Sequence, residues 1–232
     1  MGFVLLEGGN EFNGGMAAVD LRAMEVCGGR RASVRIIPAA AAPDQNHVGA
    51  GAKATAWFQA LGAADVKAVG IIDRASAERQ DLADEVANAS LVFLLGGFPR
   101  HLAECLSGSS TWRAILDAQR NGAVIAGSSA GAMVLCERYF DPESETVLKG
   151  LNLVPGACVI PHHERFGRSW AVRLAPLLPQ VVLIGIGEET GLMNDGPQGR
   201  WTVYGKGAVT LYRRSNVDTF YHGQELELPF FG

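Results

Sequence analysis

A serine stands at the centre of a Gly-Ser-Ser-Ala-Gly turn in this sequence, at residue 129. An apolar run at residues 123–126 leads into the turn, and an Ala-rich segment follows it. This pattern is typical of a serine in a sharp turn between a strand and a helix, because small neighbouring residues permit such a turn. The N-terminus of the helix offers backbone N–H groups that can stabilise the negative charge formed when the serine attacks a carbonyl group. Ser129 is therefore the first candidate nucleophile.

A serine nucleophile needs a base within hydrogen-bond reach, and the base needs an acid that orients it. Of the five histidines, His162 and His163 stand in the most suggestive context, because they follow an apolar run and Pro161. His47 and His222 fit structural or solvated positions. The residues alone leave the choice between His162 and His163 open.

Two sets of acidic residues are candidates for the orienting acid. Glu188 and Glu189 end an apolar run, and acids at the end of a buried strand are costly unless they are paired or functional. Asp141, Glu143 and Glu145 form the alternative, although a solvated acidic loop is the simpler interpretation of that segment.

Gly96 and Gly97 follow another apolar run, at residues 91–95. Glycine backbone can approach a substrate closely, so the N–H of Gly97 is a candidate oxyanion donor beside that of Ala130. A plain tight turn explains the two glycines equally well.

Short apolar runs alternate with helix-like stretches and must position these residues. The runs are 4–6, 34–37, 66–72, 91–95, 124–126 and 181–186, and the helix-like stretches are 49–61, 75–88, 111–121 and 168–178. Continuous apolar strands are typical of sheets buried on both faces, so the pattern predicts an open, doubly wound parallel sheet. Active sites form at the carboxyl ends of such strands, where Gly97, Ser129 and Glu188 fall.

The character of the chain changes after about residue 200. Short β-type runs at 201–204, 208–212 and 219–221 predict a small antiparallel extension and not an independent domain. We find no repeat or linker, so we expect a single α/β domain over residues 1–232.

Composition excludes several classes of protein. A net charge of −4 without a basic run argues against nucleic acid as the main partner. No apolar stretch approaches the ~20 residues of a membrane span, and the N-terminus lacks an export signal, so we expect a cytoplasmic protein. The four cysteines are scattered without metal-type spacing, so we expect reduced thiols and no metal site.

The order of these motifs resembles the serine peptidase family that includes aspartyl dipeptidase (peptidase E) and cyanophycinase. The resemblance runs from about residue 91 to 192 and rests on the serine turn, on Pro161-His162 after segment 150–155, and on the Gly-Ile-Gly-Glu-Glu-Thr run at 185–190. It implies a flavodoxin-like three-layer sandwich related to class I glutamine amidotransferases, with serine replacing their elbow cysteine. It also implies a Ser-His-Glu triad without metal or organic cofactor.

Carried onto this sequence, the family's roles make Ser129 the nucleophile, His162 the base and Glu188 the acid that orients the imidazole. The N–H groups of Gly97 and Ala130 would form the oxyanion hole. The resemblance thus favours one choice among the alternatives that the residues leave open.

Some residues depart from the family's pattern, and others match its binding residues. Phe98 and Pro99 stand where polar residues are usual, which makes the pocket wall more apolar and puts a strict preference for an acidic first residue in doubt. Gly187 replaces an aspartate often found before the triad glutamate. Arg165 and Arg168 resemble the basic residues that follow the histidine in cyanophycinases. An arginine there could bind a substrate carboxylate through two hydrogen bonds.

We therefore expect a serine peptidase that hydrolyses short peptides through an acyl-enzyme, as a dipeptidase E-like or cyanophycinase-like exopeptidase. The alternatives are an amidase or esterase on the same scaffold, and a catalytically silent member that binds a small ligand. The sequence leaves open the substrate side chains, the α- or β-peptide linkage and the oligomeric state, with a homodimer as one alternative.

Overall fold

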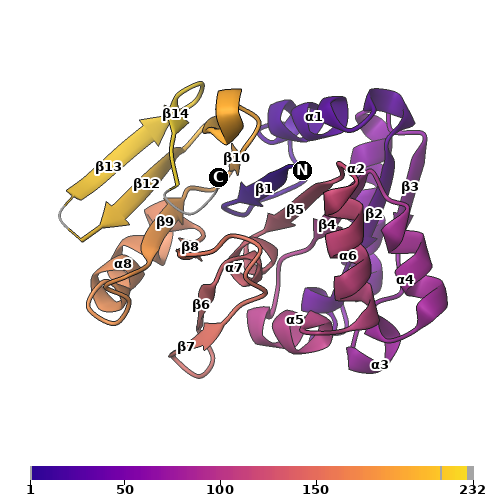
Figure 1. Ribbon diagram of the computed structural model, residues 1–232, viewed down its shortest axis with the longest axis horizontal. Coiled ribbons are helices and arrows are strands. Elements are labelled where there is room, and N and C mark those ends of the chain that lie inside the picture. Colours follow the sequence, from indigo (N-terminus) through magenta and orange to yellow (C-terminus); the bar gives the residue numbers. More distant parts are fainter. Residues whose placement is uncertain (1, 215, 229–232) are drawn as a thin grey trace.

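The computed structural model describes residues 2–214 and 216–228, and strands alternate with helices along most of the chain (Figure 1). The strands are β1 (Val4–Glu7), β2 (Ser33–Ile37), β3 (Asp65–Ala68), β4 (Leu91–Leu94), β5 (Val124–Ser128), β6 (Arg138–Asp141), β7 (Thr146–Lys149), β8 (Ala157–Ile160), β9 (Val182–Ile186), β10 (Thr190–Met193), β11 (Trp201–Gly205), β12 (Ala208–Arg213), β13 (Asn216–Tyr221) and β14 (Glu225–Leu226). The α-helices are α1 (Ala17–Val26), α2 (His47–Ala60), α3 (Arg74–Ala77), α4 (Gln80–Ala87), α5 (Pro99–Leu106), α6 (Ser110–Arg120), α7 (Ala130–Leu135) and α8 (Arg168–Leu174). The shorter helical turns are η1 (Gly29–Arg31), η2 (Ala39–Ala41), η3 (His163–Gly167) and η4 (Pro197–Gly199).

The main sheet has eight strands in the order β14-β11-β10-β1-β5-β4-β2-β3. The pairs β1–β5, β5–β4, β4–β2 and β2–β3 are parallel, and β10, β11 and β14 extend the sheet with antiparallel pairs. The structure therefore confirms the predicted α/β fold with a mostly parallel central sheet.

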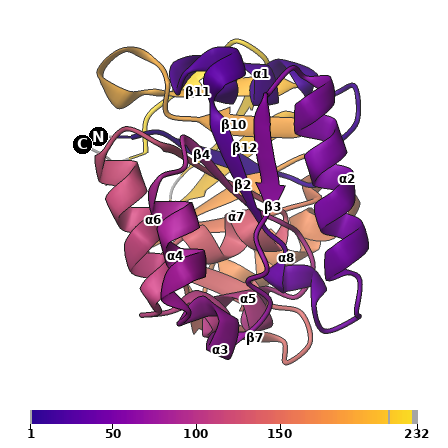
Figure 2. The same ribbon diagram turned by 90° about the vertical axis from the view of Figure 1, so that its right-hand side faces the viewer.

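Helices cover both faces of this sheet (Figure 2). Because side chains alternate along a strand, Leu5 and Phe93 point to the layer of α1 and α2, whereas Leu6 and Leu94 point to the layer of α4 to α7. Strands that are apolar at every position must be covered on both sides. The result is the three-layer, flavodoxin-like sandwich that the family resemblance implies.

The later strands differ in part from expectation. The run 181–186 lies outside the main sheet, because β9 belongs to a second sheet with the order β13-β12-β9-β8. The C-terminal strands are antiparallel as predicted, but they divide between the sheets: β11 joins the main sheet, and β12 and β13 join the second. Figure 1 shows β12 and β13 side by side next to β9. Gly205 ends β11 at the point where the chain changes sheets, with φ +101°. Only glycine fits there, because a Cβ would lie 2.0 Å from the carbonyl oxygen of Glu189.

Candidate active site

Ser129 occupies a sharp turn between β5 and α7, with φ 49° and ψ −112°. A side chain at either flanking glycine would collide with backbone: a Cβ on Gly127 would lie 2.5 Å from the carbonyl carbon of Gly131, and one on Gly131 would lie 2.2 Å from the oxygen of Leu94. The Ser129 N–H donates to the carbonyl oxygen of Glu7, at 3.0 Å. Strain of this kind persists only where the surroundings fix it, and here the neighbouring backbone does so.

His162 lies directly against this serine, with 3.1 Å between Ser129 Oγ and His162 Nε2. The histidine follows β8 and has a left-handed backbone conformation at φ 47° and ψ 43°. Its N–H donates to the carbonyl oxygen of Gly8, at 2.8 Å. The imidazole also packs onto Gly9, where a Cβ would lie 2.2 Å from His162 Cε1. The loop after β1 therefore fixes both the backbone and the ring of His162.

Glu188 contacts the other nitrogen of the same ring, with Nδ1 and Oε1 2.8 Å apart. The two side chains are 22% and 17% exposed, so the pair is shielded but reachable from solvent. The Glu188 N–H donates to the Glu164 carboxylate, at 3.0 and 3.1 Å from its two oxygens, and Arg165 Nε lies 3.3 Å from Glu188 Oε1. With Nδ1–H donating to Glu188, Nε2 is the nitrogen free to accept the serine proton.

The adjacent histidine points elsewhere. His163 Nε2 lies 2.8 Å from the Tyr212 hydroxyl on β12, and the side chain is buried. Burial lowers the pKa of His163, and the positive charge of Arg168 lowers it further. The structure therefore brings His162, and not His163, to the serine.

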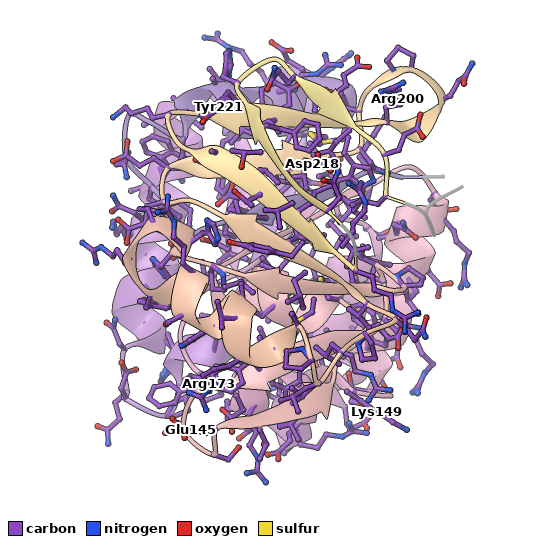
Figure 3. All side chains as sticks on the ribbon, turned by 90° about the vertical axis from the view of Figure 1, so that its left-hand side faces the viewer. Glu145, Lys149, Arg173, Arg200, Asp218 and Tyr221 are labelled. Carbon is purple, nitrogen blue, oxygen red and sulfur yellow. The ribbon has the colours of Figure 1, made fainter. Side chains whose placement is uncertain are left out.

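Three of the other candidate acids, Glu189, Asp141 and Glu145, have partners of their own. Glu189 pairs with Lys206, at 2.5 Å between Oε2 and Nζ. Asp141 accepts from the Ser144 hydroxyl at 2.5 Å within the β6–β7 turn. Glu145 Oε1 lies 3.3 Å from Arg173 Nη1 on α8, and Figure 3 labels these two side chains near each other. Of Glu188, Glu189, Asp141, Glu143 and Glu145, all within the described residues, only Glu188 contacts the imidazole of His162.

The Gly96-Gly97 turn after β4 adjoins the serine. A Cβ on Gly96 would lie 3.3 Å from Ser129 Cβ, and Gly97, at φ +136°, passes so close to Ala40 that a Cβ there would lie 2.2 Å from its carbonyl oxygen. Ala130 is the first residue of α7, so its N–H has no acceptor within the helix. The turn that carries Gly97 and the first residue of α7 thus both adjoin Ser129.

The three predicted substrate-binding residues, Phe98, Arg165 and Arg168, lie in different places around the candidate site. Phe98 is half-buried at the start of α5, and its N–H donates to the carbonyl oxygen of Ala40 at 2.8 Å. Arg165 contacts Glu188 through Nε, while its side chain is 68% exposed. Arg168 is exposed and lines a cleft that also includes Glu188, on the side of β12.

Sequence reasoning missed residues whose importance depends on contacts distant in the chain. Gly8 and Gly9 hold His162, Glu164 holds the backbone of Glu188, and the Phe166 ring lies 5.4 Å from the His162 ring, centroid to centroid. The Gly-Gly pair after the first apolar run is a signal that was available, because it repeats the pattern of Gly96-Gly97.

Residues 2–214 and 216–228 contain no group of three or more His, Cys, Asp or Glu side chains arranged to hold a metal ion. Within the same residues, no helix combines the length and apolar character needed to cross a bilayer.

Comparison with known proteins adds a family match. The model of peptidase family S51 matches residues 3–198. A cyanophycinase of Geminocystis herdmanii is 26% identical over 234 residues, covering 95% of this chain and 84% of the relative. A cyanophycinase of Trichormus variabilis is 29% identical over 195 residues, which span 79% of this chain but only 64% of the relative.

Two solved structures are also similar. A peptidase from an acI-B1 actinobacterium superposes with a TM-score of 0.87 at 25% identity, over 98% of this chain and 97% of the other. A protein of Listeria monocytogenes provisionally named a peptidase E superposes with a TM-score of 0.60 at 16% identity, over 98% of this chain and all of the other. The second likeness concerns the fold alone.

Proposed function

The chain belongs to peptidase family S51, a family of serine peptidases, and on this premise we propose that Ser129, His162 and Glu188 form its catalytic triad. The observation that carries the proposal is one unbroken line of contacts. Ser129 Oγ lies 3.1 Å from one imidazole nitrogen of His162, and Glu188 Oε1 lies 2.8 Å from the other. This is the arrangement in which a neutral imidazole activates a hydroxyl.

The first half of the reaction is acylation. His162 Nε2 takes the hydroxyl proton as Ser129 Oγ attacks the peptide carbonyl carbon, and Glu188 stabilises the imidazolium. The N–H groups of Gly97 and Ala130 donate to the oxyanion of the tetrahedral intermediate. The C–N bond then breaks, and His162 passes its proton to the leaving amine.

The second half is deacylation by water. His162 takes a proton from water as the water oxygen attacks the ester of Ser129, and the serine leaves with that proton restored. The acid product and the free enzyme result. No group other than side chains, backbone N–H groups and water takes part in this scheme.

We propose a short peptide as the substrate and exopeptidase cleavage as the mode. A cavity of about 480 Å³ adjoins the Gly96-Gly97 turn, a size suited to a small ligand. Arg165 and Arg168 are proposed to bind a substrate carboxylate, and Phe98 supplies an apolar wall. Relatives named cyanophycinases agree with a peptide substrate, whose side chains and linkage we leave unassigned.

The test is labelling with a fluorophosphonate followed by peptide mapping of the adduct. We expect a label on Ser129 in the wild type, none in Ser129→Ala, and a retained label in Ser128→Ala. Hydrolysis of a dipeptide panel that includes Asp-X and β-Asp-Arg peptides should disappear in Ser129→Ala, with an unchanged circular dichroism spectrum.

Undiminished hydrolysis by Ser129→Ala would remove the nucleophile from the proposal. Glutamine and simple esters in the same panel separate a peptidase from an amidase or an esterase. A wild type that hydrolyses none of these and takes no label would be a binding protein.

A further inference from the structure

Glu11 lies in the loop between β1 and α1, and its carboxylate is held beside the nucleophile. Its Oε2 accepts a hydrogen bond from the Ser128 hydroxyl, at 3.0 Å. Ser128 is fully buried and directly precedes Ser129 in the chain. One oxygen of Glu11 is therefore fixed to the rigid end of β5.

The other oxygen faces the space above Gly96. A Cβ on Gly96 would lie 3.4 Å from Glu11 Oε1 and 3.3 Å from Ser129 Cβ. The Glu11 carboxylate and the Ser129 side chain thus both border Gly96, which precedes the proposed oxyanion donor Gly97. A ligand that reaches Ser129 over Gly96 also reaches Glu11 Oε1.

Glu11 and Gly96 also line the cavity of about 480 Å³, as do Phe12, Lys53 and Gly97. Among the described residues, no Lys, Arg or His nitrogen lies within the 4.0 Å of an ion pair with Glu11. Lys53, which shares the cavity, stands 6.0 Å from the centre of the Phe12 ring. The cavity wall next to Gly96 therefore carries a carboxylate without an ion-pair partner among the described residues, which favours a cationic ligand group.

We propose that Glu11 binds the α-ammonium group of the first residue of the substrate, so that the enzyme requires a free N-terminus. The proposal rests on Ser129 being the nucleophile. In an α-linked substrate, the α-nitrogen lies two bonds of about 1.5 Å from the carbonyl carbon that Ser129 attacks, so its binding group must stand close to the serine. Glu11 does so, whereas a lysine or arginine side chain carries its charge several bonds farther from that carbon.

Glu11→Gln separates this role from support of the serine turn. The glutamine oxygen still accepts from the Ser128 hydroxyl, but the negative charge is gone. If Glu11 only positions the serine turn, Glu11→Gln should change the hydrolysis of every substrate alike. If Glu11 binds the ammonium group, Glu11→Gln should lower kcat/KM only for substrates with a free amine, mainly by raising KM.

The experiment measures hydrolysis of alanyl, leucyl and aspartyl p-nitroanilides and of their N-acetyl counterparts. The wild type should prefer at least one free amine over its acetylated form. Glu11→Gln should lower kcat/KM for that free amine by roughly 10- to 100-fold, the effect of one charge-assisted hydrogen bond, and leave the acetylated form unchanged. Asp44→Asn, which removes a carboxylate from the rim of the same cavity, should retain the preference.

Equal losses on free and acetylated substrates would overturn the proposal, as would a wild type that cleaves acetylated substrates equally well or cleaves no free amine. Labelling by a fluorophosphonate distinguishes a failure of the triad proposal from a failure of the proposed role of Glu11. A label on Ser129 without any preference for a free amine leaves the triad in place and removes the role of Glu11. Absence of the label in the wild type removes the triad itself.

Discussion

The serine turn and the loops that carry His162 and Glu188 are built in opposite ways. Gly127, Ser129 and Gly131 lie within five residues of one another, and buried backbone of the main sheet surrounds them. His162 and Glu188 follow strands of the second sheet, and the β1 loop from the main sheet holds the histidine in place. Local backbone therefore positions the serine, whereas contacts between distant loops position its partners.

The strongest test of this contrast compares adjacent histidines. His162→Ala should lower kcat by roughly 10⁴- to 10⁶-fold, because the serine loses its base. His163→Asn should keep activity within about tenfold of the wild type, since His163 bonds to Tyr212 and not to the serine. Steady-state assays on the same peptide measure both, and a larger loss in His163→Asn would contradict the assignment.

Glu188→Gln should lower kcat by about 10³- to 10⁴-fold, because a neutral amide stabilises the imidazolium poorly and allows the wrong tautomer. Glu189→Gln is the matched control, since its partner is Lys206. Activity of both variants is measured with the fold checked by circular dichroism. Similar losses in the two would show that the charge of the loop matters, and not the contact with His162.

Glycine substitutions distinguish the two regions directly. Gly131→Ala should lower the free energy of unfolding by about 3 kcal/mol, because its Cβ meets the backbone oxygen of Leu94. Gly9→Ala should cost less stability but lower kcat/KM roughly 100-fold, because its Cβ displaces the imidazole of His162. Urea unfolding and kinetics on both variants measure this, and equal stability losses would remove the contrast.

The smallest expected effect concerns two acids buried beside the serine turn. Burial raises the pKa of Glu7 well above its usual range, with contributions from Asp20 and then Glu11. Burial likewise raises the pKa of Asp20 from 3.8 to about 6, although the hydrogen bond from Trp57 lowers it in part. The folded protein therefore holds protons that the unfolded chain releases at lower pH.

The contribution of Asp20 to stability should accordingly be fully present below about pH 4 and be lost as pH rises to about 6, by on the order of 2 kcal/mol. Asp20→Asn should flatten this slope, since the amide still accepts from Trp57 and cannot ionise. Urea unfolding at pH 4, 5, 6 and 7 measures the slope. A slope of the same size in Asp20→Asn would show that other groups cause it.

The sequence by itself determined the features that depend on neighbours in the chain. The small residues around Ser129 specified the turn, because only glycine fits against the backbone at 127 and 131. The continuous apolar runs specified a sheet covered on both faces, since such strands cannot face water. The antiparallel C-terminal strands followed from their short β-type runs.

Apart from what the family resemblance implies for Ser129, His162 and Glu188, only the tertiary structure decided which side chains meet. Adjacent residues His162 and His163 have similar sequence contexts, and the left-handed backbone of His162 separates their side chains. The same holds for the division of β11 and β12 between two sheets and for the places of Gly9 and Glu11. These outcomes depend on loops far apart in the sequence that come together only when both sheets have formed, and no local pattern of residue types encodes that meeting.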